Sequence, residues 1–291
     1  MKRPAKVLAE GIGQPEGPCA LPDGRIVFTD TYRSALVSWG PDDGLRRYAY
    51  TGGAPNACAL GSDGHVYVAN CPTAGSWVAP DKRPACIQRA SADSKVEIIA
   101  THADGVAFDG PNDLCFGPDG RLYFTDSGDW APETRHHRGR ICVLDHDGAG
   151  HILEELDHTY PNGIAAEGDG SIVWVESYTR QMIRRRPDGG KTVIHTFAPE
   201  HIPDGFKIDI DGNFWVATVT SCGIDIVSHA GAAMDFLELD AVPLNCLFVG
   251  DSLYVADFGH LETTREIQSV GRLLRVDVGV RGMATFSGAI Q

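Results

Sequence analysis

Short apolar runs alternate with polar turns along nearly the whole chain, and the turns fall at a fixed distance from a proline. Six prolines are each followed, eight residues later, by an aspartate, and five of these six aspartates precede a glycine. Successive prolines lie 40 to 56 residues apart, and an apolar, β-branched or aromatic run such as residues 25–30 follows each turn. Repeats of this length, built from a strand, an Asp-Gly turn and a second strand, are typical of β-propellers. The prolines are Pro15, Pro55, Pro111, Pro161, Pro203 and Pro243, and the aspartates are Asp23, Asp63, Asp119, Asp169, Asp211 and Asp251.

The repeat predicts an all-β fold in which residues 1–291 form a single domain, a six-bladed β-propeller of four-stranded antiparallel blades. Residues 6–10 precede Pro15 at the place of an outer strand. They are therefore expected to complete the last blade, whose inner strands fall within residues 244–277. Closing the ring with strands from both termini would remove the open sheet edge. Residues 283–287 are the alternative candidate for that outer strand.

Two long insertions, residues 71–86 and 127–139, interrupt the regular spacing of the repeats. Long loops on a rigid scaffold are where binding specificity is usually found. Each insertion is therefore expected either to contribute to a binding site or to be a tolerated surface loop, and the pattern does not separate these two roles.

Net charge and composition limit the classes of partner that this protein is expected to bind. The net charge is −14 and the main basic cluster is residues 184–186, so nucleic acid is not expected as a partner. The same acidic balance agrees with a site for a divalent cation. No run approaches the ~20 apolar residues of a membrane span, and the first ten residues lack the apolar stretch of a signal peptide. The protein is therefore expected to be cytoplasmic, without a membrane partner.

Eight cysteines are present, but their spacing predicts neither a disulfide framework nor a zinc site. Four of them fall three or four positions after a repeat proline, as expected of small buried residues in equivalent strands. No Cys-x-x-Cys pair occurs. Reduced thiols are therefore expected, and Cys71 and Cys86, which flank the first insertion, are the one pair worth testing for a bond.

The residue directly after each repeat proline carries the strongest functional signal. In a closed ring these six positions share one height near the axis, and five of the six bear a side-chain oxygen. Converging buried carboxylates are costly unless a cation neutralises them, and all-oxygen ligands suit Ca²⁺ first and Mg²⁺ or Mn²⁺ second. The alternative is that these residues only cap strand starts, since Pro-Asn and Asn-Gly are common turn pairs. The residues are Glu16, Asn56, Asn112, Asn162, Asp204 and Leu244.

The motifs around these positions resemble those of the SMP-30/gluconolactonase/LRE-like family over essentially the whole chain, and they comprise residues 14–18, 110–114, 120–128, 160–163 and 203–217. The resemblance implies a propeller with one divalent ion in its central tunnel (Ca²⁺ before Mg²⁺, Mn²⁺ or Zn²⁺), and many members hydrolyse sugar lactones. Matched by motif, Glu16, Asn162 and Asp204 would be metal ligands. Asn112 would either contact substrate or join the ligands. Gly110 stands where vertebrate-type members carry an arginine that helps hold substrate, so other five- or six-membered lactones stay equally open.

The sequence thus predicts a divalent-metal-dependent hydrolase that opens a small sugar-type lactone. The cation would polarise the carbonyl, and Asp204 would either accept a proton from the attacking water or attack the carbonyl itself. Asn56 and Asn112 are the expected substrate contacts near the axis. Two alternatives stay open: a phosphotriesterase or esterase at the same site, and a non-catalytic Ca²⁺-binding or interaction propeller. A strictosidine-synthase-like propeller is disfavoured, because such relatives do not depend on this metal set.

Further polar side chains end the second strands of their blades at a matching register, fifteen residues after the proline. Asp126, Glu176 and Asn70 are expected to cap turns or support the site, and Asp126 and Glu176 are also candidate substrate-binding residues. A last group is expected to consist of solvated loop residues or of proton carriers at the tunnel mouth: His136, His137, His201 and residues 258–260.

Overall fold

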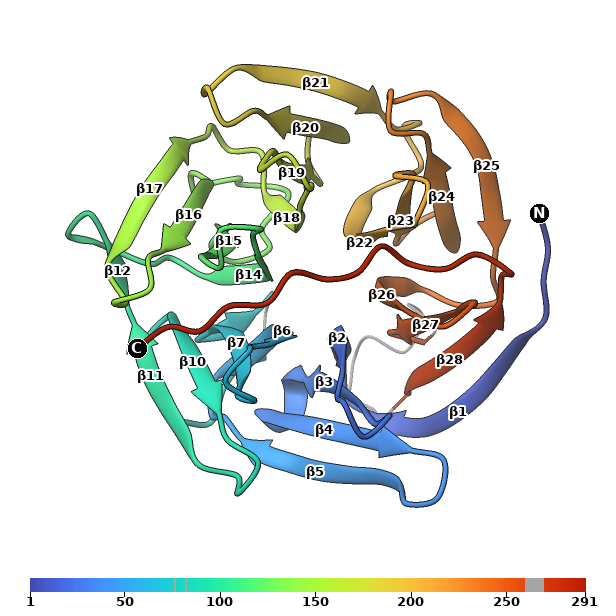
Figure 1. Ribbon diagram of the computed structural model, residues 1–291, viewed down its shortest axis with the longest axis horizontal. Coiled ribbons are helices and arrows are strands. Elements are labelled where there is room, and N and C mark those ends of the chain that lie inside the picture. The colour runs from blue at the N-terminus through green and yellow to red at the C-terminus, as the bar shows by residue number, and fades with distance from the viewer. Residues whose placement is uncertain (76, 82, 260–269) are drawn as a thin grey trace.

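The protein is a ring of six four-stranded antiparallel sheets around a central axis, as the computed structural model shows for residues 1–75, 77–81, 83–259 and 270–291 (Figure 1). The predicted all-β, six-bladed propeller is confirmed. The described residues contain no α-helix, only the short 3-10 helix η1 (Thr31–Arg33). Within those residues, no helix has the length and apolarity needed to cross a bilayer.

Each blade runs from an inner strand at the axis to an outer strand at the rim (Figure 1). Five of the six inner strands begin at a repeat proline, which is tolerated at the start of a strand because proline lacks a backbone N–H. From the axis outward, the first blade comprises β2 (Pro15–Ala20), β3 (Ile26–Asp30), β4 (Ala35–Gly40) and β5 (Gly44–Tyr50), and the second comprises β6 (Ala54–Leu60), β7 (Val66–Cys71), β10 (Cys86–Ala90) and β11 (Val96–Ala100). The third comprises β14 (Pro111–Phe116), β15 (Leu122–Asp126), β16 (Arg140–Leu144) and β17 (Gly150–Glu155), and the fourth comprises β18 (Pro161–Ala166), β19 (Ile172–Glu176), β20 (Gln181–Arg185) and β21 (Lys191–Thr196). The fifth comprises β22 (Pro203–Ile208), β23 (Phe214–Thr218), β24 (Gly223–Val227) and β25 (Ala233–Glu238), and the last comprises β26 (Pro243–Val249), β27 (Ser252–Asp257), β28 (Gly271–Asp277) and β1 (Ala5–Ile12).

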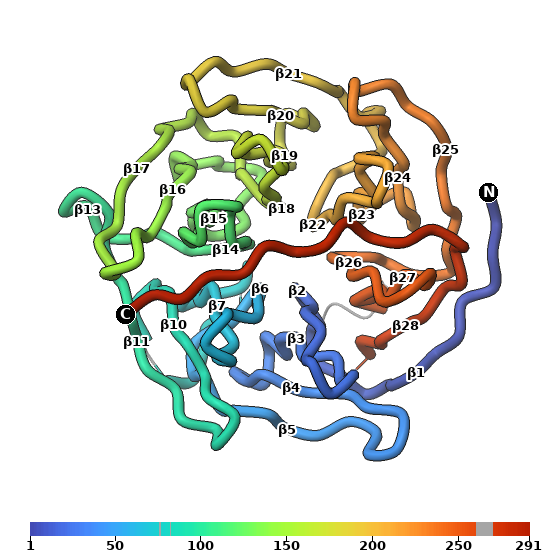
Figure 2. The backbone as a smooth tube through the Cα atoms, viewed as in Figure 1, coloured from blue at the N-terminus to red at the C-terminus, as the bar shows by residue number. Residues whose placement is uncertain are grey.

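The ring is closed by the N-terminal strand. β1 pairs antiparallel with β28, from Ala5 opposite Val276 to Ile12 opposite Gly271, and it forms the outer edge of the last blade. This confirms the prediction for residues 6–10. The alternative segment, residues 283–287, forms no strand but crosses one face of the ring on its way to the C-terminus (Figure 2).

The core lies between neighbouring blades, which explains why the second strands read as continuous apolar runs. Every residue of β3, β15, β19 and β23 is buried, because each of these strands is covered on both faces by adjacent blades. One cluster joins Tyr123 and Ile141 of the third blade to Trp174 of the fourth. The outer strands, in contrast, expose alternate or consecutive residues to solvent.

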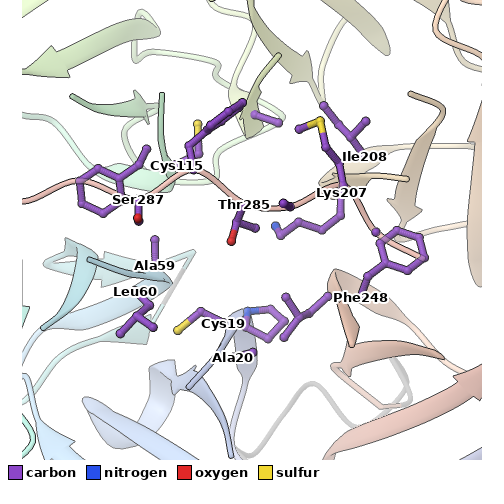
Figure 3. A pocket seen from close by; sticks show the side chains of 18 of the residues that line it. Cys19, Ala20, Ala59, Leu60, Cys115, Lys207, Ile208, Phe248, Thr285 and Ser287 are labelled. Atoms are coloured by element: carbon purple, nitrogen blue, oxygen red, sulfur yellow. The ribbon is translucent and has the colours of Figure 1, made fainter. Parts of the chain in front are cut away.

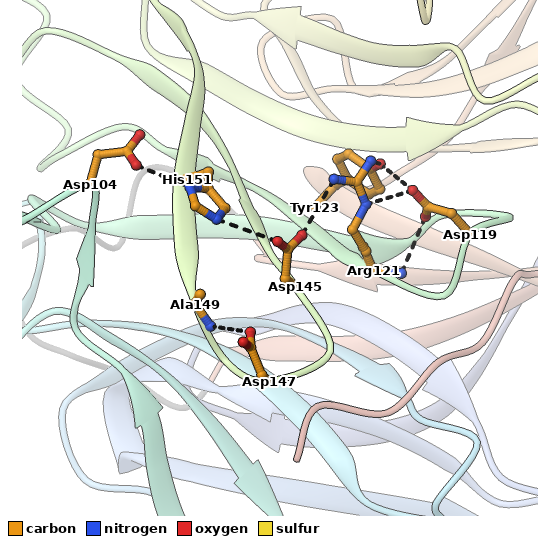
Figure 4. Close-up of polar contacts among 8 residues, drawn as sticks. All are labelled: Asp104, Asp119, Arg121, Tyr123, Asp145, Asp147, Ala149 and His151. Carbon is orange, nitrogen blue, oxygen red and sulfur yellow. Dashed lines mark hydrogen bonds and ion pairs between the residues drawn. The ribbon is translucent and has the colours of Figure 1, made fainter.

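The repeated aspartate is a turn residue that closes the hairpin between the first two strands of a blade. In the third blade, Asp119 accepts hydrogen bonds from the Arg121 backbone N–H at 3.2 Å and from the Tyr123 hydroxyl at 2.8 Å (Figure 4). Asp147 accepts the Ala149 backbone N–H at 3.1 Å in the outer hairpin of the same blade (Figure 4). An aspartate that bonds its own backbone two residues on stabilises such turns, so this feature of the repeat is structural.

A small hairpin, β12 (His102–Ala103) and β13 (Val106–Ala107), leads from the second blade into the third. Its turn is tied to the third blade by His151, whose ring contacts Asp104 at 3.0 Å and Asp145 at 3.3 Å (Figure 4). These contacts lie at the rim of the ring and are solvent-exposed, so they position the connection between blades and do not contribute to the axis.

Candidate active site

The residues that follow the repeat prolines meet in one cavity at the axis. This cavity has a volume of about 340 Å³, and its lining includes all six of them. Each directly follows the repeat proline near the start of its inner strand, and the rotational symmetry of the blades brings equivalent positions to the same height. Five of the six are polar, and the sixth closes the ring with an apolar side chain: Glu16, Asn56, Asn112, Asn162, Asp204 and Leu244.

Glycines next to these residues let the inner strands approach closely. A Cβ on Gly17 would lie 2.2 Å from the Cα of Ala57 on the next blade, and one on Gly205 would lie 2.1 Å from the side chain of Asn245. Only glycine fits such an approach. The Glu-Gly and Asp-Gly pairs of the sequence therefore combine a polar side chain that faces the cavity with a residue small enough to let the ring close beneath it.

The two carboxylates of this ring repel each other. Burial raises the pKa of Glu16 well above its ordinary value, and the charges of Asp204 and Asp113 raise it further. Burial likewise raises the pKa of Asp204 to about 8, with Asp113 contributing. The Gly17 backbone N–H donates to Glu16 at 2.6 Å, which offsets part of the cost of the charged form. Without a counter-charge, both groups therefore favour the protonated state at low and neutral pH.

The amides of the ring are held by neighbouring groups, and one of their oxygens is left without a partner. Asn162 donates to the Ser177 hydroxyl at 3.2 Å, and Asn112 donates to the Tyr160 hydroxyl at 3.3 Å. Asn56 donates to the Asn112 backbone carbonyl at 3.4 Å. The side-chain oxygen of Asn112 is buried and accepts no hydrogen bond from the described residues. A buried acceptor of this kind requires a ligand, a cation or a water molecule.

This donor set fits a divalent cation. No cluster of three or more His, Cys, Asp or Glu side chains suited to a metal occurs in the part of the chain that the structure describes, so the candidate centre depends on amide oxygens as well as on its two carboxylates. Two negative charges with neutral oxygens match a hard divalent ion such as Ca²⁺ or Mg²⁺. The unpartnered Asn112 oxygen and the unfavourable proximity of Glu16 and Asp204 are the two structural observations that support this fit.

Aromatic side chains that the repeat did not reveal form the wall of the cavity. Tyr32 comes from η1, Phe258 follows β27, and Tyr160 immediately precedes the repeat proline of its blade. Trp130 packs against Tyr160 with ring centroids 4.8 Å apart, and Tyr32 lies 6.3 Å from Phe258. Tyr160 has a positive φ of 54°, a conformation that is unfavourable for a bulky residue and is often found at functional sites. The position of Tyr160 directly before a repeat proline is the feature of the sequence that could have identified it as a cavity residue.

Both insertions contribute to this cavity. In the first, β8 (Thr73–Ala74) and β9 (Trp77–Val78) form a hairpin, and residues 73–75 line the cavity. In the second, residues 128–130 line the cavity, and Asp129 is hydrogen-bonded to Thr73 and Gly75 of the first insertion. The insertions are therefore parts of the site. Cys71 and Cys86, the pair that we considered for a disulfide, are separate buried thiols, and the other six cysteines are unpaired as well.

The insertions also explain the glycine at position 110. A Cβ on Gly110 would lie 2.8 Å from the Cys71 sulfur and 3.1 Å from the backbone of Gly128. Cys71 belongs to the first insertion and Gly128 to the second, so the two together occupy the space that a side chain at position 110 would need. Insertion residues therefore fill the space that an arginine side chain at position 110 would need.

The structure does not bring Asp126 and Glu176 into the cavity, and their assignment as substrate contacts is corrected here. Asp126 accepts the Gly110 backbone N–H at 2.7 Å and pairs with Arg140 at 3.2 Å. Glu176 accepts hydrogen bonds from the Trp174 indole at 3.3 Å and the Thr179 hydroxyl at 2.8 Å. Glu176 thus bonds within its own strand and to the turn that follows it. Asp126 holds the loop before its inner strand in place. Asn70, which donates to the Gly52 carbonyl at 2.8 Å, has the same role.

The histidines considered as proton carriers do not line the cavity where the structure describes them. His201 is paired with Asp225 at 2.6 Å, and His136 contacts Thr134 at 2.8 Å. Neither of them, nor His137, is part of the cavity lining, whereas Phe258 is. His260 lies outside the described residues.

An oxygen-rich ring at the axis of a six-bladed propeller defines a class of proteins with one small-molecule or ion site at the centre of the toroid. The family model described as "SMP-30/Gluconolactonase/LRE-like region" matches residues 14–257. The chain therefore belongs to the SMP-30/gluconolactonase/LRE-like family.

Individual relatives are distant but extend over most of the chain. A gluconolactonase of Zymomonas mobilis is 24% identical over 87% of this chain and 78% of its own length. Protein STRICTOSIDINE SYNTHASE-LIKE 4 of Arabidopsis thaliana is 21% identical over 87% of this chain and 79% of its own length. The crystal structure of the calcium-binding protein regucalcin from Agrobacterium tumefaciens superposes with a TM-score of 0.78 at 18% identity, covering 100% of this chain and 98% of that one.

Proposed function

We propose that the protein is a lactonase that depends on a divalent cation and hydrolyses a small, polar, sugar-type lactone. The observation that carries this proposal is the convergence of two carboxylates and several amides in one axial cavity. Membership of the family and the similarity to a gluconolactonase support a lactone as the substrate.

The cation would be held by Glu16, Asn162 and Asp204, with Asn112 as a further oxygen ligand. These side chains come from four different blades, and the closely packed inner strands fix their separations. When bound, the ion supplies Lewis acidity that polarises the ester carbonyl and stabilises negative charge on its oxygen. The oxygen-only donor set favours Ca²⁺, then Mg²⁺ or Mn²⁺, over metals that prefer sulfur or imidazole ligands.

Asp204 is the residue that we assign to the chemical step. It remains partly exposed to the cavity, unlike Glu16, so its carboxylate can reach a bound substrate. It would accept the proton of the attacking water as a general base, or attack the carbonyl carbon directly. The Asn162 side chain and the Gly205 backbone hydrogen-bond its carboxylate and orient it in either role.

Asn56 and Asn112 would recognise hydroxyl or ring oxygens of the substrate, and the aromatic wall would exclude water from the reacting bond. Both amides lie on the cavity lining between the two carboxylate-bearing strands β2 and β22. A volume of about 340 Å³ accommodates one small ring with a few ordered waters, but no polymer. Trp130 and Tyr32 offer apolar faces against which a lactone ring can pack.

A pH-indicator assay across aldonolactones, simple γ- and δ-lactones and one phosphotriester tests this proposal. The protein would first be stripped of metal and then loaded in turn with Ca²⁺, Mg²⁺, Mn²⁺ or Zn²⁺. We expect lactone turnover that is lost on chelation and restored by at least one of these ions. Turnover of the phosphotriester alone, or of no ester with any ion, would contradict the lactonase assignment.

A further inference from the structure

A second, larger cavity occupies the opposite mouth of the ring. It has a volume of about 1020 Å³ and shares no lining residue with the candidate active site. Along each inner strand, the residue one position after the proline faces the active site, and the residue four positions after it faces the second cavity. The residues in that lower position are Cys19, Ala59, Cys115, Ala165, Lys207 and Leu247.

A close-packed layer separates the two cavities. It consists of the residues two positions after the prolines, among them Gly17, Gly205 and Ala57, whose backbones leave no room for larger side chains. Within this layer, Asn245 donates to the Asp113 carboxylate at 3.2 Å, which joins two blades on opposite sides of the axis. The second cavity is therefore a separate space that a ligand reaches from the other face of the protein.

Lys207 places a positive charge at the base of this cavity. Its ammonium group donates to the Phe206 carbonyl at 3.1 Å and to the Asn245 side-chain oxygen at 3.3 Å. An ammonium group has three donor hydrogens, so one of them is unused by these bonds. Lys207 is half-buried and forms no ion pair with any residue that the structure describes, although it lowers the pKa of nearby Asp113. A partly desolvated cation without a contacting anion favours binding of one.

Two further polar residues of this cavity belong to the C-terminal segment, and Ser62, Asp251 and Arg281 line it as well. The C-terminal segment crosses its mouth and is fixed on either side by backbone bonds, from Met283 to Ile208 at 2.9 Å and from Ser62 to Gly288 at 2.8 Å. Between these anchors, Thr285 and Ser287 line the cavity, and the structure shows no hydrogen-bond partner for either hydroxyl among the described residues. Figure 3 shows both hydroxyls and the Lys207 ammonium directed toward the same central space.

We infer that this second cavity binds a small organic carboxylate. Lys207 pairs with the carboxylate, and the hydroxyls of Thr285 and Ser287 contact its oxygens or neighbouring polar groups. The lining also includes the exposed Arg281 and the carboxylate of Asp251, whose opposite charges offset each other, so Lys207 remains as the uncompensated cation and favours a monoanion over a phosphate dianion. The carbon skeleton of the ligand packs on apolar wall residues, which include Cys19, Leu60, Cys115, Ile208 and Phe248 (Figure 3).

This inference does not depend on the proposed lactonase activity, since the two cavities are separate. The test is isothermal titration of the full chain, in the presence of Ca²⁺, with hexanoate as the carboxylate and 1-hexanol as its uncharged match. We expect the protein to bind hexanoate and to bind 1-hexanol at least about 10-fold more weakly, as the loss of one charge-assisted hydrogen bond implies.

Substitutions then locate the site. Lys207→Met should weaken hexanoate binding at least about 10-fold, and Lys207→Arg should retain most of it. Lys95→Met serves as the matched control, because Lys95 is exposed on an outer hairpin and far from the axis in the blade order, and it should leave binding unchanged. If Lys207→Met does not fold, as judged by circular dichroism, the double variant Thr285→Val with Ser287→Ala replaces it and should weaken binding several-fold.

Three results would overturn the inference. The first is the absence of hexanoate binding to the unmodified protein at millimolar concentration. The second is binding that the Lys207 and hydroxyl substitutions leave unchanged. The third is binding that Asp204→Asn abolishes while Lys207→Met does not, which would place the anion in the other cavity. A failure of lactone turnover has no bearing on any of these readouts.

Discussion

At the scale of single residues, the main feature of the site is that the carboxylates of Glu16 and Asp204 are enclosed close to each other. Burial raises the pKa of both, the charges of Asp204 and Asp113 raise that of Glu16 further, and the charge of Asp113 raises that of Asp204. Such an arrangement is unfavourable as a purely structural device, because apolar residues would fill the same space at lower cost. A cation between the two side chains, as proposed above, would account for its presence at the second position of equivalent strands.

Replacing Asp204 by asparagine tests this residue directly. Asp204→Asn keeps the shape of the side chain but removes both a negative ligand and the proton acceptor, so kcat/KM for the best lactone should fall by about 10²–10⁴-fold. Asp211→Asn, at an exposed turn of the same blade, is the matched control and should be nearly neutral. Both variants should keep the far-ultraviolet circular dichroism of the parent. Retention of most activity in Asp204→Asn would remove this residue from the chemical step.

At the scale of elements, the two insertions determine the shape of the site. The second insertion contributes Trp130, which is held by contacts with Tyr160 and with Tyr178 at a ring-centroid distance of 4.9 Å. Because these rings belong to the connection between β17 and β18 and to the turn after β19, the insertion is packed onto the scaffold by aromatic contacts.

Trp130→Ala should therefore affect substrate binding more than the chemical step. Removal of one aromatic face from the wall is expected to raise KM about 3- to 10-fold, with a smaller change in kcat. Glu133→Ala, in the same insertion but outside the cavity lining, is the control and should leave both constants unchanged. Steady-state kinetics on one lactone measure the two effects. A fall in kcat with constant KM would show that the insertion acts on the reacting bond instead.

The N-terminal strand is the second element whose role can be tested. Deletion of residues 1–12 removes β1 and leaves β28 as an open edge, so the apparent Tm should fall by about 10 °C or more and aggregation should increase. Deletion of residues 1–3 removes only exposed contacts, such as the ion pair of Lys2 with Glu238, and should have little effect. Differential scanning calorimetry distinguishes these outcomes, and an unchanged Tm for the longer deletion would contradict closure by β1.

The sequence allowed the fold and the polar ring to be predicted because both follow from a repeat. Equivalent positions of the repeats meet at the axis, so Glu16, Asn162 and Asp204 could be assigned to one place without any pairwise contact information. Tyr32 could not be found in this way, because it comes from η1, outside the repeated register, and Phe258 shares the strand-end register but is not polar like the other residues there. Asp126 lies at the same repeat position as the ends of other second strands, so its place in the blade could be predicted. Its side chain bonds the loop before the inner strand, and the spacing of the repeats does not indicate that contact.

At the scale of the whole molecule, the carboxylates would link the proposed metal binding to stability. Their folded-state pKa values are raised, so the metal-free folded protein holds protons more tightly than the unfolded chain. This contribution to stability is present below the unfolded pKa of 3.8 and is lost as the pH rises through the folded value of about 8 for Asp204. A bound cation should compensate for the loss.

The chelated protein is accordingly expected to lose thermal stability between pH 5 and about pH 8, and Ca²⁺ should restore more of it at the upper end of this range. Asp204→Asn should show a smaller dependence on pH when chelated, and comparing the two proteins cancels the contributions of histidines that titrate in the same range. Melting temperatures measured at several pH values, with and without Ca²⁺, give the result. A slope that is equal in both proteins would contradict the linkage.

The close-packed layer across the axis also determines from which face a small molecule can reach the active-site cavity. The hydrogen bond between Asn245 and Asp113 spans the axis, and the cavities on its two sides share no lining residue, so the ring holds two separate cavities that open on opposite faces. In the proposed lactonase, the substrate would enter and the product would leave through the same opening, beside the two insertions. The ring-opened acid keeps the oxygen atoms that the cavity would bind, so it should occupy the substrate site and act as a competitive inhibitor.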